Sequence, residues 1–133
     1  EISSLSAILL NEAYYELLKT GQMMVDGIPV LSPTCLIPFK AKAWLDLKKR
    51  KLNGEQVDSK NIKKHKNDVF RLAQLITANT RQVLSPEIAE DMKKFLSEIA
   101  DETVDLKSLG IRGTHKQKII DMLYLCYNLN DNT

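Results

Sequence analysis

The stretch that decides the fold is Leu31–Leu75, LSPTCLIPFKAKAWLDLKKRKLNGEQVDSKNIKKHKNDVFRLAQL. Apolar residues recur at the spacing of an amphipathic helix, first over about 38–52 and again over about 60–77. These residues are Leu36, Phe39, Ala43, Trp44 and Leu47, then Ile62, Val69, Leu72, Ala73 and Ile76. A polar loop opened by Asn53-Gly54 separates the segments, so the sequence predicts two helices joined by a loop.

Both predicted helices begin at recognisable caps. Ser32-Pro33 places a capping hydroxyl before a proline at the first helical position, and Asp58 or Ser59 caps the second helix. Pro38 removes a backbone donor inside the first helix. We therefore expect the first turn to be kinked or separate, with the main helix beginning near Pro38.

Two more helices are predicted towards the C-terminus. Ser85 caps a helix over about Pro86–Ala100, where a proline again follows the cap. Thr114 is expected to cap the last helix, His115–Leu129. Both segments carry apolar residues along one face.

Before Leu31, the clearest local signal is Asp26-Gly27, which predicts a β-hairpin over Gln22–Leu31. This dipeptide tolerates the positive φ angles of a type I′ turn. Pro29 cannot donate a ladder hydrogen bond, so its strand must lie at an edge or pair on one side only.

The N-terminal residues favour a strand over Ile2–Leu10, where apolar residues alternate along the chain. A single long helix over Leu5–Lys19 is the alternative. In the strand interpretation, Asn11 caps a short helix over Glu12–Lys19, and Gly21 stops it as the residue beyond its end.

Length and composition fit one folded domain of 133 residues, 44% hydrophobic and 27% charged. We expect a mainly α-helical protein, with a hairpin and short-helix element over residues 1–31 and a helical bundle over 32–129. No apolar run approaches a membrane span, and Cys35 and Cys126 are expected to be reduced core thiols, so the sequence predicts a cytoplasmic protein. The chain lacks an initiator Met and starts inside the predicted strand, so we expect the C-terminal part of a longer α+β protein.

The basic residues gather in the middle of the chain. Residues 40–71 hold eleven Lys or Arg and four Asp or Glu, a net charge of +7, and the remainder carries −5 to give the overall +2. A basic segment of this kind attracts anionic ligands, although a merely solvated surface gives the same pattern. The runs LKKRK and KKHK lack interleaved aromatic residues, so contact with a nucleic-acid backbone stays open and base stacking is not indicated.

Two charged residues fall on otherwise apolar helical faces. Lys40 lies in the row of Leu36 and Trp44, and Asp68 lies one turn before Leu72. Lys40 either extends past Trp44 into water or meets a phosphate or carboxylate in a cleft. If the two helices pack antiparallel, Lys40 is the preferred partner of Asp68, in a structural or a functional ion pair.

His65 and Lys66 complete a cluster around Asp68. His65 lies one turn before Asp68 and can share its carboxylate, although a lone histidine is commonly a packing or surface residue. We predict Lys40, Lys66 and His65 as candidate phosphate-binding residues and Asp68 as the candidate catalytic residue. The sequence contains no Gly-rich phosphate loop, nucleophile elbow or zinc spacing, and no metal ligands are predicted.

Two segments, GIPVLSPTCLIPFKAKAWLDL and KKHKNDVFRLAQL, together resemble the C-terminal half of the abortive-infection type nucleotidyltransferases, the toxins of some toxin–antitoxin pairs. That family has a polymerase-β-like core and a helix of the form Leu-Ile-x-x-Lys-x-x-Ala. Its second helix carries Arg-Asp-x-x-Asp-Leu. The corresponding residues here are Leu36, Ile37, Lys40 and Ala43, then Asn67, Asp68, Arg71 and Leu72. Asn67 and Arg71 stand where the family has arginine and its second aspartate.

The resemblance implies that this chain helps to form a nucleotide cleft. Lys40 would contact the phosphates of a nucleoside triphosphate, and Asp68 would orient Lys40 or a neighbouring base. The Mg²⁺ ligands would belong to an N-terminal catalytic half, so the present residues alone are expected to be inactive. An antitoxin protein and an RNA substrate are possible partners. The alternative is a helical interaction module that binds a protein or a nucleic-acid backbone through residues 40–71.

Overall fold

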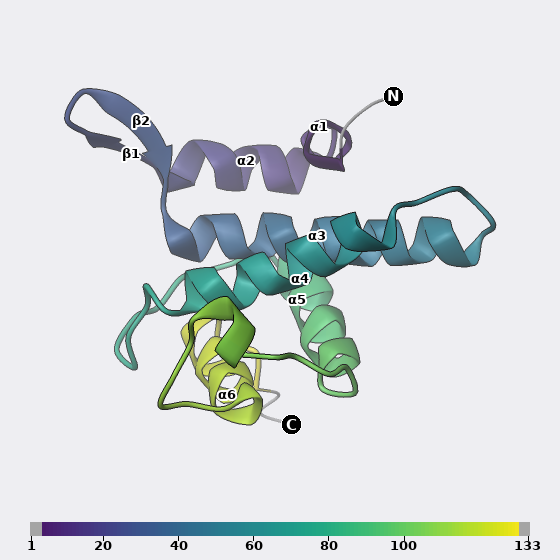
Figure 1. The fold of residues 1–133 in the computed structure, drawn as a ribbon. Helices are drawn as coiled ribbons and strands as arrows, with labels where there is room; N and C mark the ends of the chain where they lie inside the picture. Colours follow the sequence, from purple (N-terminus) through teal and green to yellow (C-terminus); the bar gives the residue numbers. More distant parts are fainter. Residues whose placement is uncertain (1–3, 131–133) are drawn as a thin grey trace.

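The computed structural model describes residues 4–130 and consists of α-helices with one β-hairpin (Figure 1). In chain order the elements are α1 (Ser4–Ile8), α2 (Glu12–Gly21), β1 (Gln22–Val25), β2 (Ile28–Leu31), α3 (Pro33–Leu52), α4 (Ser59–Ala73), α5 (Pro86–Ile99), the 3-10 turn η1 (Lys107–Leu109) and α6 (Lys116–Cys126). The predicted mainly α-helical fold with a small β element is confirmed. None of the helices within residues 4–130 is long and apolar enough to cross a membrane.

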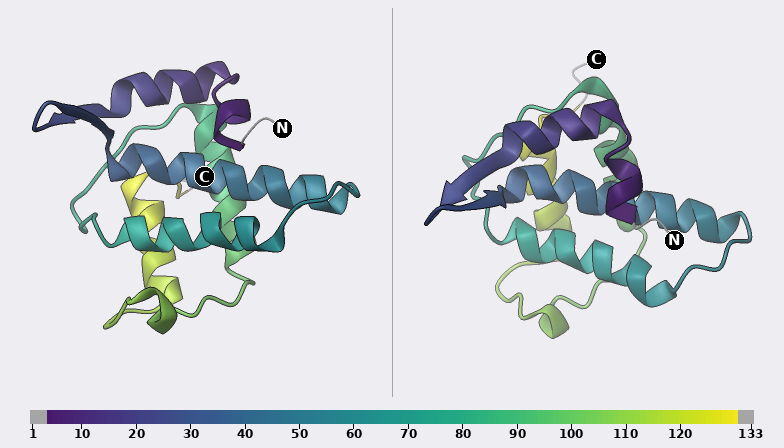
Figure 2. Two further views of the ribbon diagram at one scale, coloured as in Figure 1. Left: turned by 45° about the horizontal axis from the view of Figure 1, so that its top comes forward. Right: turned by 90° about the horizontal axis from the view of Figure 1, so that it is seen from above.

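The longest helix, α3, has 20 residues, and α1, α2, α4 and α5 pack against it (Figure 2). Helix α2 lies along one side of α3, and α4 runs antiparallel to α3 along another side (Figures 1 and 2). Helices α5 and α6 cross this layer. The antiparallel pair is the two-helix unit that the sequence predicts for residues 31–75.

Two apolar clusters hold the helices together. The larger cluster joins α3, α4, α5 and α6, and in it the rings of Trp44 and Phe95 meet edge to face with centroids 5.4 Å apart. The smaller cluster joins α1, α2, α3 and α5, and there Tyr14 meets Phe39 edge to face, also at 5.4 Å. Helix α3 therefore contributes side chains to both clusters.

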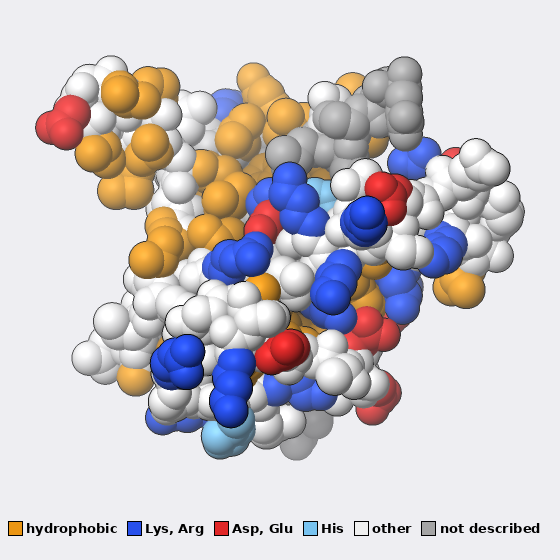
Figure 3. Space-filling model, in the orientation of Figure 1, with side chains coloured by type: hydrophobic (Ala, Val, Ile, Leu, Met, Phe, Trp, Pro, Cys, Tyr) orange, Lys and Arg blue, Asp and Glu red, His pale blue; other side chains and the backbone are white. Residues whose placement is uncertain are grey.

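The β-hairpin is confirmed, with Asp26 (φ 52°) and Gly27 (φ 78°) in the turn between β1 and β2. It extends beyond the helices, and Figure 3 shows apolar side chains exposed over it. The Ser32 amide donates to the Gly21 carbonyl at 2.9 Å, which makes Gly21 and Ser32 a hydrogen-bonded pair. Non-hydrogen-bonded and hydrogen-bonded pairs then alternate towards the turn. Pro29 consequently falls in a non-hydrogen-bonded pair, and β2 pairs on one side only, as predicted.

The strand predicted for Ile2–Leu10 is wrong over its described part, since α1 is helical; residues 2 and 3 lie outside the described residues. The alternative of one long helix is also wrong, because the chain turns before Asn11. That side chain caps α2 by accepting from the amides of Ala13 and Tyr14, as predicted for Asn11. The apolar side chains near position 8 are buried in the smaller cluster. A helical turn can place them there as well as a strand can.

Gly21 plays a different part from the one that the sequence predicts. It is the last residue of α2, not a left-handed residue beyond the helix. A Cβ at this position would overlap the Cβ and Sγ atoms of Cys35. Glycine is required here because the end of α2 packs directly on the first turn of α3.

The separate first turn predicted before Pro38 does not occur, and α3 is continuous from Pro33. In a regular helix the amide of residue 38 would donate to the Thr34 carbonyl, which proline cannot do. The hydroxyl of Tyr127 donates to that carbonyl instead, at 2.6 Å. The backbone acceptor that proline leaves open is therefore satisfied from the C-terminal end of the fold.

Three predicted helix boundaries also need correction, one of them the end of α6, which lies at Cys126 and not at Leu129. Helix α4 ends at Ala73 instead of near Thr77, because residues 77–80 form a turn in which the Thr80 hydroxyl accepts from the Thr77 amide. The cap of α6 is His115, whose Nδ1 accepts from the Lys118 amide at 3.3 Å, and not Thr114. An imidazole is an uncommon cap, so the usual residue preferences point one position too early.

Candidate functional site

The α3–α4 interface brings Lys40 and Asp68 together. The Lys40 Nζ atom lies 3.0 Å from Asp68 Oδ2, and the two side chains are 16% and 19% exposed. Arg71, one turn along α4, places Nη1 3.3 Å from Asp68 Oδ1. Each carboxylate oxygen thus faces a cation, and the pairing that antiparallel packing predicts is confirmed.

His65 borders this ion pair without joining it. Its Nδ1 atom is buried and has no hydrogen-bond partner in the part of the chain that the structure describes. Burial and the nearby Lys40 ammonium lower the pKa of His65 below 6.5, and the opposing charge of Asp68 does not offset them. The neutral form of the ring is therefore favoured. The predicted sharing of the Asp68 carboxylate is not seen as a hydrogen bond among the described residues.

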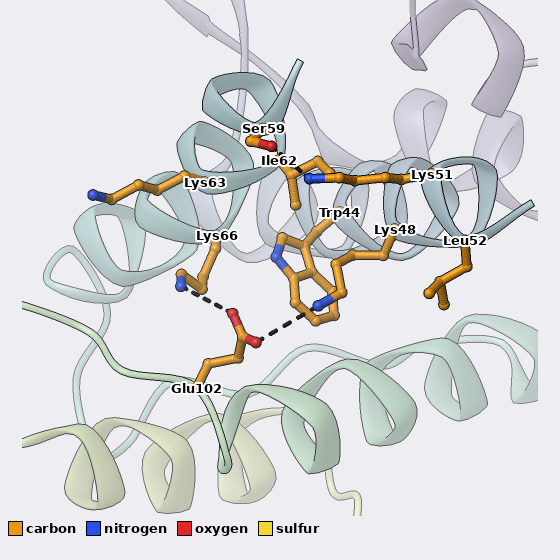
Figure 4. Close-up of a pocket in the computed structure, with 9 residues that line it drawn as sticks. All are labelled: Trp44, Lys48, Lys51, Leu52, Ser59, Ile62, Lys63, Lys66 and Glu102. Atoms are coloured by element: carbon orange, nitrogen blue, oxygen red, sulfur yellow. Dashed lines mark hydrogen bonds and ion pairs between the residues drawn. The ribbon is translucent and has the colours of Figure 1, made fainter. Parts of the chain in front are cut away.

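Lys66 faces the opposite side of α4 and is only 7% exposed. Its ammonium lies 3.2 Å from Glu102 Oε1 and donates to the Thr103 carbonyl at 3.3 Å. Lys48 of α3 approaches the other oxygen, Glu102 Oε2, at 3.6 Å (Figure 4). Lys66 therefore belongs to a second cluster, separate from Lys40 and Asp68, and the sequence prediction that grouped these lysines is wrong on this point.

The charges around Glu102 favour its ionised form. Burial alone would raise the pKa of this carboxyl, but the hydrogen bond from Lys66 and the charges of Lys48 and Lys66 outweigh it and lower the pKa. The backbone is fixed as well, because the Lys116 ammonium donates to the carbonyls of Ala100 at 2.7 Å and Glu102 at 2.8 Å. The carboxylate is thus held between two lysines from different helices.

A pocket of about 580 Å³ opens beside this cluster, between the C-terminal half of α3 and the N-terminal half of α4 (Figure 4). It is lined by Trp44, Lys48, Lys51, Leu52, Ser59, Ile62, Lys63, Lys66 and Glu102. Four lysines and one carboxylate give the lining a formal charge of +3. The volume is in the range of pockets that hold small ligands.

The four lysines of the pocket differ in their partners. Besides Lys48 and Lys66, which share Glu102, Lys51 donates to the neutral hydroxyl of Ser59. Lys48 also lies 4.9 Å from the centre of the Trp44 ring. The ammonium of Lys63 makes no ion pair or hydrogen bond with any residue from 4 to 130, and it points away from the other lining residues (Figure 4).

A further polar cluster ties α2 to α5. The buried hydroxyl of Tyr14 donates to Asp91 at 2.7 Å, and burial together with this carboxylate raises the pKa of Tyr14. Lys42 lies 3.5 Å from Asp91 and 3.6 Å from Asp46. Lys42 and Asp46 therefore belong to a partly buried network that holds helices together.

Within residues 4–130, no group of His, Cys, Asp and Glu side chains is arranged to hold a metal ion. The nucleotidyltransferase resemblance places the Mg²⁺ ligands in an N-terminal half. Asp68 is not an open ligand here, because both of its oxygens already face cations. We therefore assign no step to a metal bound by these residues.

Comparisons of the chain with protein-family models, curated proteins and solved structures found no match. Any function must therefore be argued from the residues and their geometry.

Sequence reasoning missed the pocket and its carboxylate. One signal was present for Lys66, which lies four residues after Ile62 and four before Phe70 in a buried helical row. No such signal exists for Glu102, which lies 36 residues further along the chain in the segment between α5 and η1.

Proposed function

We propose that this chain is the helical half of a nucleotidyltransferase-like protein and helps to form its nucleotide cleft. The observation that supports the proposal is the ion pair between Lys40 and Asp68, at 3.0 Å. These residues come from the two separate motifs that carry the family resemblance. Their contact is what a shared role in one site requires, although a structural ion pair would make the same contact.

In the proposed cleft, Asp68 is a positioning residue. It fixes the Lys40 ammonium, which at 16% exposure keeps a path to solvent and hence to a phosphate oxygen. The catalytic carboxylates, the metal and the nucleoside triphosphate would come with an N-terminal half. These 133 residues alone are expected to catalyse no transfer.

The test is nucleotide incorporation into RNA by the intact protein, comparing Lys40→Ala with Lys49→Ala. Lys49 is an exposed lysine of the same helix and serves as the matched control. We expect metal-dependent incorporation that Lys40→Ala abolishes and Lys49→Ala preserves. Incorporation that survives Lys40→Ala in a folded variant would remove Lys40 from the site.

A second candidate is a module that binds a nucleic-acid backbone through residues 40–71. The observation that favours it is the pocket, which gathers four of the segment's eleven basic residues. Binding of single-stranded RNA that weakens steeply with added salt would support it. Capture of RNA that is insensitive to salt, or binding to proteins only, would contradict it. The residues encoded upstream of Glu1 separate the two candidates, because a Gly-Ser followed by paired acids on a strand favours the enzyme.

A further inference from the structure

We propose that the pocket between α3 and α4 binds a ligand carrying two or more phosphate groups, and that Glu102 occupies a phosphate position when no ligand is bound. The proposal narrows the second candidate function, on which it rests for its ligand chemistry. It requires no catalytic half, and it involves none of the residues of the Lys40–Asp68 pair.

The pocket has an excess of positive charge. Glu102 is the single carboxylate among the lining residues, and it faces two of the four lysines. Lys51 contacts only a neutral hydroxyl there, so its charge is not balanced within the pocket. A single carboxylate on a ligand would leave most of this excess in place, whereas two phosphates carry enough charge to balance it.

Glu102 lies between two lysines of the pocket. Its two oxygens approach Lys66 at 3.2 Å and Lys48 at 3.6 Å, which is the bridging arrangement of a phosphate between two lysines. The Lys66 side chain is 9% exposed and needs a counter-anion, while the Glu102 side chain is 35% exposed and can swing outwards. A phosphate entering the pocket can therefore take over the contacts that Glu102 makes.

The lining of the pocket combines apolar and basic side chains. Trp44, Ile62 and Leu52 form an apolar part of the pocket. The ammonium groups of Lys48, Lys51 and Lys66 lie near this part, whereas that of Lys63 points away from it (Figure 4). A pocket of about 580 Å³ has room for a phosphate chain together with an attached organic group. Both a free nucleotide and a nucleic-acid backbone supply phosphates in this form, and the experiment must distinguish these two sources.

The proposal is tested by titrating the purified chain with inorganic tripolyphosphate and following the fluorescence of Trp44, the only tryptophan. Two matched pairs of variants locate the site. Lys48→Gln and Lys63→Gln change pocket residues, and Lys49→Gln and Lys64→Gln change their exposed neighbours outside the pocket. We expect each pocket variant to weaken binding about fivefold, and each neighbour to leave it within about twofold of the wild type. Equal weakening by pocket and neighbour variants would overturn the proposal.

The Glu102→Gln variant distinguishes a carboxylate that occupies a ligand position from one that has only a structural role. Removing the internal anion is expected to tighten tripolyphosphate binding about tenfold. The melting temperature of this variant should fall without ligand and rise with tripolyphosphate by more than that of the wild type. Unchanged or weaker tripolyphosphate binding by folded Glu102→Gln would contradict the proposal that Glu102 occupies a phosphate position. If neither the wild type nor the variant binds tripolyphosphate, the proposal that the pocket binds phosphates is contradicted as well.

Two further ligands identify the source of the phosphates. Tighter binding of a nucleoside triphosphate than of tripolyphosphate indicates a free nucleotide, and tighter binding of single-stranded RNA that tripolyphosphate displaces indicates a backbone. Either result supports the proposal if Lys48→Gln and Lys63→Gln weaken it. If RNA binds equally well to these variants and tripolyphosphate does not bind, the proposed phosphate binding in the pocket is contradicted. The second candidate function would still be supported by such a result.

Discussion

Tyr127 donates its hydroxyl hydrogen to the carbonyl oxygen of Thr34 at 2.6 Å, across 93 residues of sequence. This contact lies beside Pro38, the residue that cannot make the same hydrogen bond. The end of α6 therefore completes the first turn of α3. Since α3 carries side chains of both charged clusters, the contact also fixes the helix from which the candidate sites are built.

Tyr127→Phe should lower the free energy of unfolding by about 1–2 kcal/mol, because it leaves the Thr34 carbonyl without a donor. Urea unfolding measures this change. Tyr124→Phe is the control, since the Tyr124 hydroxyl makes no hydrogen bond with the residues that the structure describes. Adding Pro38→Ala to Tyr127→Phe supplies a backbone donor and should recover part of the loss, and a further loss in the double variant would contradict this explanation.

Replacing Gly21 with alanine should destabilise the fold by about 1–3 kcal/mol, because the added methyl group overlaps Cys35. The helical position alone would predict the opposite sign, since alanine favours helices over glycine by up to about 1 kcal/mol. Thermal or urea unfolding separates the two effects. An unchanged or more stable Gly21→Ala variant would show that α2 can shift away from α3 at no cost.

The lowered pKa of Glu102 predicts a pH-dependent contribution to stability. A carboxyl whose pKa is lower in the folded state stabilises the fold above its ordinary value of 4.5, and the contribution is lost as the pH falls through the folded-state pKa. The difference in unfolding free energy between the wild type and Glu102→Gln should therefore shrink as the pH is lowered below 4.5. Asp101→Asn, at the exposed neighbouring position, is the control, and a difference that stays constant with pH would contradict the assignment.

The imidazole of His65 should titrate below 6.5 in the folded protein, as measured by NMR, with a His115→Gln variant to assign the two histidine signals. Lys40→Gln should move the pKa of His65 upwards, because it removes a positive charge that opposes protonation. Lys60→Gln, elsewhere on α4, should not. Because burial lowers this pKa, protonation of His65 in acid should also cost stability as the pH falls below 6.5.

The sequence allowed the central part of the fold to be predicted because its signals are local. Caps, helical spacing and the turn dipeptide Asp26-Gly27 each act within a few residues, and they gave α3, α4, α5 and the hairpin. Lys40 and Asp68 could be paired because both interrupt apolar rows on consecutive helices joined by a short loop. Antiparallel packing of such neighbours is a strong expectation.

The features that escaped prediction depend on distant parts of the chain. The continuity of α3 through Pro38 needs Tyr127, and the burial of Lys66 needs Glu102, and neither partner can be inferred from spacing. The segment before Asn11 was misassigned for a different reason. Short apolar runs fit a strand and a helical turn almost equally, and packing against α3 decides between them.

The hairpin has two free edges that are chemically unequal. In the alternating pattern of its pairs, Met24 of β1 directs its backbone N–H and C=O outwards, whereas the facing residue of β2, Pro29, has no N–H to offer. An unfolded or misfolded chain can therefore form backbone hydrogen bonds with all the outward-facing groups of β1. Along β2 the series of hydrogen bonds is interrupted at Pro29. The sheet can therefore be extended readily in one direction only, which limits the growth of aggregates from an otherwise apolar and exposed element.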